Sequence, residues 1–174
     1  MKKLLALIAA LVAADILTKS LVLMATPLSF HMWGNFREIY PGFMVLWSGL
    51  PFFNLILVWN SGVSFSLFAN NAELGRWILV IASSAVVGFL FYLLRSERSR
   101  MGSLGFALVI AGAIGNIFDR VRYGAVVDFL DFHAFGWHWP AFNMADMLIV
   151  LGVFLLIIRK DPVKLSNKKE NSHG

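Results

Sequence analysis

Cysteine is absent from this chain of 174 residues, and charged residues are scarce. Without a thiol the protein can form no disulfide, and it has no thiolate nucleophile or thiolate metal ligand. Charged residues make up 14% of the chain and hydrophobic residues 59%, whereas soluble domains hold about 25% charged and about 45–50% apolar residues. The mean hydropathy is +0.73. The composition therefore indicates a membrane protein, and the length fits a single domain.

Several motifs that carry chemistry are also missing. The chain has no HExxH zinc spacing and no Gly-rich phosphate loop, and Ser64 and Ser66 have no recognisable histidine or lysine partner motif. The formal net charge of +5 comes mainly from basic residues at the ends of apolar runs, which argues against a nucleic-acid partner. The sequence shows no internal repeat, which weakens an inverted-repeat transporter interpretation.

One metal site remains an alternative. His133 and His138 could ligate zinc together with Asp128 or Asp131. Neighbouring tryptophans, however, make the two histidines fit a membrane-interface belt better than a metal centre. We therefore predict that the protein uses no metal and no other cofactor.

Four apolar runs predict four transmembrane helices. The predicted spans are about 4–24, 77–94, 101–118 and 142–158. The first run resembles a cleaved secretory signal because it starts with two lysines and an apolar core. It continues past Asp15, however, to a length of about 20 residues, which is enough to cross a bilayer. We predict an uncleaved first helix.

The segment between the first two runs has a different character. Prolines and glycines interrupt residues 26–71, which predicts a small β-rich lobe outside the membrane. Within it, residues 52–59 predict a strand that enters a turn at Asn60-Ser61-Gly62. Residues 1–160 are predicted to form one membrane-embedded domain, followed by a polar cytoplasmic tail at 161–174.

Basic residues predict the orientation in the membrane. Ten of the fifteen Lys and Arg residues fall in the amino terminus, the loop after the second run and the tail. The positive-inside rule therefore places both termini in the cytoplasm, with the β-rich lobe and the segment 115–147 on the outer face.

Four acidic residues lie in the segment 115–147, and two of them stand in apolar surroundings. Asp128 follows two valines, and Asp146 lies one turn into the fourth predicted helix. Both are expected at the outer membrane boundary. Two carboxylates held together share a proton, so that one acts as a base and the other as an acid in the attack of water on a peptide carbonyl. We predict that they form a catalytic dyad, and that Asp131 is a solvated loop acid.

Two further polar sets lie on predicted helices. Asp15 and Lys19 are four residues apart, which predicts an ion pair on one face of the first helix. This pair is either a packing element or part of the site. Asn116, Asp119 and Arg120 share the outer end of the third helix if it extends that far, and Asp119 is expected to pair with Arg120.

Five motifs, in order, resemble those of the lipoprotein signal peptidases, also called signal peptidase II, which are bacterial membrane aspartic peptidases. The motifs are DILTK at 15–19, WNSGVSFS at 59–66, GAIGNIFDR at 112–120, VVDF at 126–129 and FNMAD at 142–146. Two positions depart from the family pattern, because Ile16 stands where Gln is usual and Trp59 where Tyr is usual. Neither departure touches a carboxylate, so each bears on substrate fit.

The resemblance implies that Asp128 and Asp146 are the dyad, and that other residues bind substrate or brace the pocket. These residues are Asp15, Lys19, Asn60, Gly62, Asn116, Asp119, Arg120, Asn143 and Ala145. It implies cleavage of the signal peptide of a prolipoprotein before a diacylglyceryl-modified cysteine, without metal, in the bacterial inner membrane. The implied partners are these prolipoproteins, membrane lipid and globomycin-type inhibitors. The implied fold is four transmembrane helices, an extracytoplasmic β-cradle and a short amphipathic segment before the last helix.

Two alternatives stay open. A small proton-coupled transporter or lipid-binding scaffold could use Asp15, Lys19 and Asp146 as a proton relay. A different intramembrane aspartic peptidase is a weaker alternative, because the chain has no GxGD motif.

Overall fold

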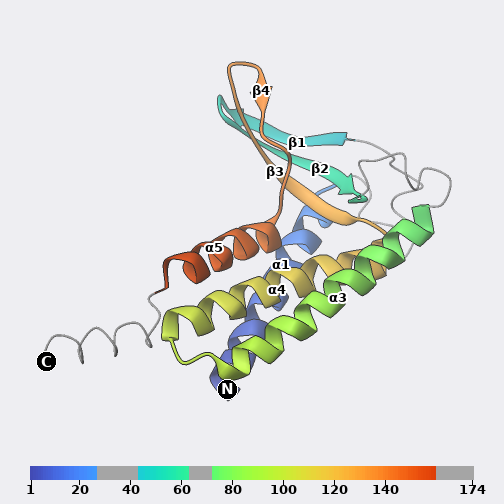
Figure 1. The fold of residues 1–174 in the computed structure, drawn as a ribbon. Helices are drawn as coiled ribbons and strands as arrows, with labels where there is room; N and C mark the ends of the chain where they lie inside the picture. The colour runs from blue at the N-terminus through green and yellow to red at the C-terminus, as the bar shows by residue number, and fades with distance from the viewer. Residues whose placement is uncertain (27–42, 63–71, 160–174) are drawn as a thin grey trace, which may run out of the picture.

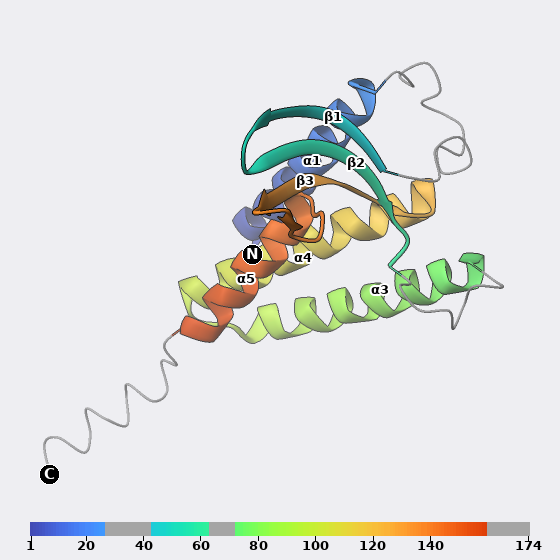
Figure 2. The ribbon, with the colours of Figure 1, turned by 90° about the horizontal axis from the view of Figure 1, so that it is seen from above.

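The computed structural model describes residues 1–26, 43–62 and 72–159 of the chain (Figure 1). The helices in these ranges are α1 (Lys2–Met24), α3 (Ala72–Ser96), α4 (Arg100–Tyr123) and α5 (Met144–Ile158). The strands are β1 (Phe43–Leu50), β2 (Phe53–Asn60), β3 (Val126–Ala134) and β4 (Trp137–His138). Helices α1, α3, α4 and α5 form a bundle, and the strands form a curved sheet at one end of it (Figures 1 and 2).

Three helices in the described ranges are long and apolar enough to cross a membrane. They are Lys2–Met24, Glu73–Ser96 and Arg100–Tyr123, with mean hydropathies of 2.0, 2.3 and 1.8. These helices agree with three of the predicted spans. The fourth, α5, is apolar but has 15 residues, or about 22 Å of helix, against a hydrocarbon core of about 30 Å. The protein is thus a helical membrane protein with a small antiparallel sheet.

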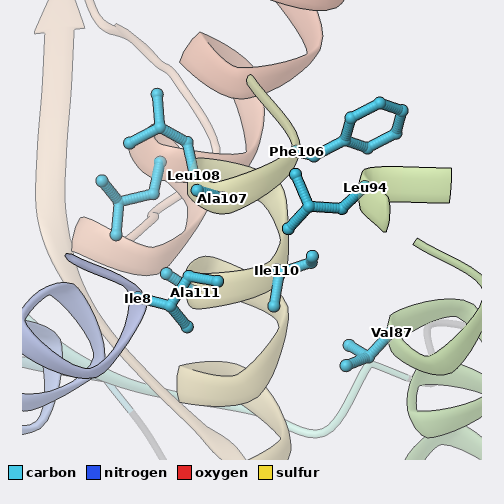
Figure 3. Close-up of a cluster of buried hydrophobic side chains, with 9 residues drawn as sticks. Ile8, Val87, Leu94, Phe106, Ala107, Leu108, Ile110 and Ala111 are labelled. Carbon is cyan, nitrogen blue, oxygen red and sulfur yellow. The ribbon is translucent and has the colours of Figure 1, made fainter. Parts of the chain in front are cut away.

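Helix α4 lies at the centre of the bundle and packs against α1, α3 and α5 (Figure 1). The buried apolar cluster around it draws side chains from all four helices (Figure 3). Its members are Ile8, Val87, Leu94, Phe106, Ala107, Leu108, Ile110, Ala111 and Leu148. Because α4 touches every other helix, polar residues at its carboxyl end can meet residues from α1 and α5.

Glycines bring α4 and α5 close together. A Cβ on Gly152 would lie 2.7 Å from the carbonyl oxygen of Gly105, and a Cβ on Gly112 would collide with the carbonyl oxygen of Ala145. Small residues allow such backbone contact between membrane helices. The close approach fixes the amino-terminal end of α5 against α4, where several of the predicted site residues lie.

The sheet has the order β1-β2-β3-β4, with antiparallel neighbours. Its register places Asn60 opposite Val126 and Val58 opposite Asp128. A second apolar cluster packs the sheet against the end of α1 and comprises Val22, Leu23, Leu57, Val127 and Phe129. The sheet therefore carries Asn60 and Asp128 to the same end of the bundle as the end of α4.

The strands differ from the predicted arrangement in two ways. β1 and β2 fall within the predicted lobe, but β3 and β4 come from the segment between α4 and α5 and belong to the same sheet. The amphipathic segment expected before the last helix is this β-hairpin followed by an extended stretch. Residues 27–42 and 63–71 of the lobe region, with Ser64 and Ser66, and the predicted tail 161–174 lie outside the described residues.

Candidate active site

Two groups of polar side chains, most of them buried, meet where α1, α4, α5 and the sheet come together. The first, which we call the lysine cluster, consists of Asp15, Lys19 and Asp119. The second, which we call the amide cluster, consists of Asp128, Asp146, Asn60, Asn116 and Asn143.

In the lysine cluster one ammonium group binds two carboxylates. Lys19 Nζ lies 2.8 Å from Asp15 Oδ2 and 2.9 Å from Asp119 Oδ2. All three side chains are at most 2% exposed. The predicted pair between Asp15 and Lys19 is confirmed. The predicted pair between Asp119 and Arg120 is wrong, because Asp119 faces α1, while Arg120 Nη1 donates to the carbonyl oxygen of Asn116 at 3.3 Å.

Each carboxylate of the lysine cluster also accepts a hydrogen bond from a backbone amide next to a residue of the predicted dyad. Asp119 Oδ2 accepts a hydrogen bond from the N–H of Val127 at 3.1 Å, directly before Asp128. Asp15 Oδ1 accepts one from the N–H of Ala145 at 2.9 Å, directly before Asp146. Lys19 thus fixes, through its two partners, the strand and the helix that carry the predicted dyad.

Asp128 lies on β3 and is 1% exposed. Its Oδ2 accepts a hydrogen bond from Asn60 Nδ2 at 2.9 Å, and its Oδ1 accepts one from Asn143 Nδ2 at 2.7 Å. The sheet register explains the first contact, since β2 ends at Asn60 beside the start of β3.

Asp146 lies in the first turn of α5. It was predicted one turn into the helix, but the helix begins only at Met144. Its Oδ1 accepts a hydrogen bond from Asn116 Nδ2 at 2.8 Å, and its Oδ2 accepts one from the backbone N–H of Asn143 at 3.2 Å. Asn143 Oδ1 accepts in return from the N–H of Asp146 at 3.0 Å, which completes a capping box.

Asn143 therefore bridges the two carboxylates. Its side-chain amide donates to Asp128 and its backbone amide donates to Asp146, and its side chain is fully buried. Asn116 joins the two clusters, because its Oδ1 accepts from Lys19 Nζ at 3.2 Å while its Nδ2 donates to Asp146. Within the described ranges neither Asp128 nor Asp146 has a cation within ion-pair distance.

The electrostatics of Asp128 follow from this environment. Burial raises the pKa of Asp128 to about 6, and the negative charge of Asp146 adds to the rise, although hydrogen bonds from Asn60 and Asn143 oppose it. An ordinary aspartate has a pKa of about 3.9. Asp128 can therefore gain and lose a proton near neutral pH.

Gly62 and Arg120 close one side of the amide cluster. The N–H of Gly62 donates to Asn60 Oδ1 at 2.8 Å, which orients the Asn60 amide toward Asp128. Gly62 has a φ of 70°, and a Cβ there would lie 3.0 Å from Arg120 Nη2. The structure thus brings every predicted site residue, Ala145 included, to this end of the bundle.

Asp131 does not fit its prediction as a solvated loop acid. It lies on β3 and is 3% exposed. It accepts a hydrogen bond from Asn54 Nδ2 at 2.8 Å, and His138 Nδ1 lies 2.9 Å from its Oδ1. Burial alone would raise the pKa of Asp131, but the hydrogen bonds from Asn54 and His138 outweigh it and lower the pKa. Asn54 was not predicted from the sequence, because its position opposite Asp131 becomes visible only with the strand register.

The zinc alternative finds little support in this geometry. His133 and His138 stack with ring centroids 4.9 Å apart. In the part of the chain that the structure describes, no group of three or more histidine or acidic side chains could hold a metal ion.

The structure is thus that of a helical membrane protein in which one asparagine, Asn143, bridges a pair of aspartates. Residues 7–160 match the sequence model of the family described as Signal peptidase (SPase) II. The chain therefore belongs to the signal peptidase II family.

Relatives found by sequence similarity agree with this assignment. The chain is 47% identical over 108 residues to the lipoprotein signal peptidase of Paraburkholderia phymatum, and 46% identical to that of Burkholderia mallei. Each match covers 62% of this chain and 65% of the relative's length.

Two solved structures are similar in fold, and both are described as bacterial membrane enzymes studied by the in meso method. One has a TM-score of 0.69 at 25% identity and covers 91% of this chain and 92% of the other. The second has a TM-score of 0.67 at 24% identity, covers 98% and 92%, and supports the fold alone.

Proposed function

We propose that this chain is an aspartic endopeptidase that removes the signal peptide from diacylglyceryl-modified prolipoproteins. The observation that carries the proposal is the bridge through Asn143, which holds Asp128 and Asp146 together without a neutralising cation. Membership of the signal peptidase II family supports the choice of reaction. The carboxylates require no metal or other cofactor for this chemistry.

The two aspartates take different roles in the proposed mechanism. Asp146 is the base, because Asp128 is the member of the pair that holds a proton in part near neutral pH. Asp128 is the acid, because its pKa of about 6 leaves it protonated in part near neutral pH. Asp146 takes a proton from water as the water oxygen attacks the scissile carbonyl carbon, and Asp128 gives its proton to the carbonyl oxygen. Asp146 then protonates the leaving nitrogen as the C–N bond breaks, while one hydroxyl of the intermediate returns its proton to Asp128 as the C=O bond reforms.

The remaining predicted site residues have supporting roles. Asn60, Asn116 and Asn143 orient the carboxylates, and Arg120 with Gly62 forms the wall beside them. Asp15, Lys19, Asp119 and Ala145 hold the backbone on which the dyad stands.

The proposed setting is the bacterial inner membrane. Helix α5 is the fourth span of a single domain at 1–160, both termini and the tail at 161–174 are cytoplasmic, and the lobe and the dyad lie at the outer face. The diacylglyceryl chains of the substrate would then anchor the scissile bond at the level of Asp128 and Asp146. Globomycin-type inhibitors would bind the same site.

Purified protein in detergent tests the proposal with a diacylglyceryl prolipoprotein and no ion gradient. Asp128→Asn and Asp146→Asn should each abolish cleavage while the protein stays folded, and a chelator should have no effect. Asp131→Asn is the matched control, because it removes a buried acid from the same strand outside the dyad. An active Asp146→Asn variant would exclude the dyad. Flux in sealed vesicles without cleavage would favour the transporter instead.

A further inference from the structure

The end of the sheet that projects away from the helices consists mainly of apolar side chains. The turn between β1 and β2 and the turn between β3 and β4 both lie there, since Phe53 on β2 pairs with Phe132 on β3. We call the large exposed apolar residues at this end the aromatic tip. They are Leu50, Phe52, Phe132, Phe135, Trp137 and Trp139.

The aromatic tip lacks the charges that a water-facing surface usually carries. Residues 43–60 and residues 132–142 contain no Asp, Glu, Lys or Arg. Hairpin turns are normally rich in Gly, Asn and Asp, and a contiguous exposed apolar patch usually marks contact with a partner or a membrane. The tip is therefore built for an apolar or interfacial environment.

Phe135 gives independent evidence. It stands with Gly136 at the centre of the two-residue turn between β3 and β4, and their φ angles are 52° and 81°. Such a turn favours Asn, Asp or Gly at its first position, because a left-handed φ strains a bulky side chain. The Phe135 ring is nevertheless fully exposed within the protein. A strained backbone that presents a phenyl ring outward indicates that the ring is covered by something outside the chain.

A shallow hollow of about 400 Å³ opens beside the turn. Its lining residues are Phe52, Phe132, His133, Ala134, Trp137, Trp139 and Phe142. Phe142 directly precedes Asn143, the cap of α5. The hollow thus reaches the residue before the cap of α5, and Val150, Phe154 and Ile157 are exposed on one side of that helix. That side of α5 is apolar, as expected for a surface in contact with lipid.

The direction of β3 sets the level of the tip. Strand β3 starts just after the end of α4 and runs across the common direction of the helices, so the tip overhangs the side of the bundle (Figures 1 and 2). If the helices cross the membrane, the tip therefore lies beside the bundle and not beyond the end of α4. Aromatic rings, and tryptophan above all, prefer the headgroup level of a membrane.

We propose that the aromatic tip is seated in the headgroup–acyl boundary of the bilayer that the helices span, with lipid chains covering Phe135 and the hollow. The occupant is phospholipid of the same membrane. The seat anchors the sheet at a second point, away from the helix bundle, and thereby fixes the height of β3, which carries Asp128. The inference rests on the membrane-spanning helices and not on the peptidase reaction.

The absence of native cysteine allows a test with single nitroxide labels in phosphatidylcholine vesicles. Phe135→Cys reports on the tip. Arg98→Cys, in the exposed loop between α3 and α4, is the water control, and Val150→Cys, exposed on α5, is the lipid control. The measured quantity is the collision rate of the label with oxygen divided by its collision rate with a water-soluble nickel chelate. This ratio should be several-fold higher at residue 135 than at residue 98, and should approach the ratio at residue 150.

Two results would overturn the proposal. A label at residue 135 that matches residue 98 would place the tip in water, and a label shielded from both oxygen and nickel would place it against protein. Unlabelled protein provides a second measurement. The emission of Trp137 and Trp139 is the difference between the fluorescence of the wild type and that of the double variant Trp137→Phe/Trp139→Phe. Lipids with brominated acyl chains should quench this emission. Unquenched emission would contradict the proposal even if labelling distorts the turn.

Discussion

The lysine cluster and the amide cluster contain the same number of carboxylates, lie side by side and share Asn116, yet their charges are handled differently. In the lysine cluster the Lys19 ammonium binds both Asp15 and Asp119. In the amide cluster Asp128 and Asp146 receive hydrogen bonds from neutral amides. Both clusters satisfy their oxygen atoms, but only the first provides a counter-charge at contact distance.

This difference separates structural acids from reactive ones. A buried carboxylate in contact with an ammonium group is held in place by the ion pair, so it serves as a fixed hydrogen-bond acceptor. A buried carboxylate with amide partners and a second carboxylate nearby can exchange a proton near neutral pH. Asp15 and Asp119 therefore suit the positioning of Ala145 and Val127, whereas Asp128 and Asp146 suit proton transfer.

The largest effect is expected when the counter-charge is removed. Lys19→Met leaves two buried carboxylates without a counter-charge, and loss of one member of a buried ion pair costs about 3–5 kcal/mol. We expect the unfolding free energy in detergent to fall by that order, with activity lost as the backbone at Ala145 and Val127 loosens. Lys3→Met, at the exposed start of α1, is the control and should change neither quantity. A stable and active Lys19→Met variant would remove the basis of the comparison.

The pH dependence of stability tests the amide cluster, through its member Asp128. The folded pKa of Asp128, about 6, lies above its unfolded value, so its contribution to stability is full below pH 4 and is lost as pH rises through 6. A rise of about two units corresponds to about 3 kcal/mol. The unfolding free energy of the wild type should therefore decline over this range more steeply than that of Asp128→Asn. Parallel curves for the two proteins would contradict the raised pKa.

Asn143→Ala should break the amide cluster while its carboxylates remain. The variant loses the hydrogen bond to Asp128 and the side-chain cap of Asp146. Misplacement of catalytic groups by about 1 Å costs about 100-fold in rate, so we expect kcat to fall by that order. The alkaline limb of the pH–rate profile should move to higher pH, because Asp128 must be protonated to act as the acid and a hydrogen bond that favours its ionised form is gone. Asn54→Ala, which removes the equivalent bond to Asp131, is the control and should leave the profile unchanged.

The sequence predicted which residues gather at the site and the pair between Asp15 and Lys19, but not the partner of Asp119. Adjacent positions on a helix point in different directions, which is why Asp119 turns from Arg120 toward Lys19, a residue 100 positions away in the chain. That partner depends on how α1 packs against α4, and no local pattern encodes it. Asp131 looked solvated because its burial depends on the pairing of β2 with β3.

The capping box formed by Asn143 and Asp146 could have been predicted from the sequence. Asn143 and Asp146 have the three-residue spacing of a capping box, which indicates that α5 begins after Asn143. The prediction of one continuous apolar span at 142–158 instead placed Asp146 deeper in the helix. The strand course of residues 126–138 was harder to predict, because its apolar residues continue the hydrophobic character of the neighbouring helices.

The smallest expected effect tests whether the lysine cluster acts on the dyad through position alone. A Cβ on Gly115 would collide with Asp15 Oδ2, so Gly115→Ala must displace the carboxylate that holds the N–H of Ala145. Overpacking of this kind costs about 1–3 kcal/mol. We expect a similar fall in stability and a modest loss of kcat, measured by thermal unfolding and by cleavage at saturating substrate. Gly88→Ala on α3, where a Cβ would meet nothing within 4 Å, is the control and should be neutral. If Gly115→Ala kept its stability but lost activity completely, Asp15 would take part in the reaction itself, and the division between structural and reactive acids would fail.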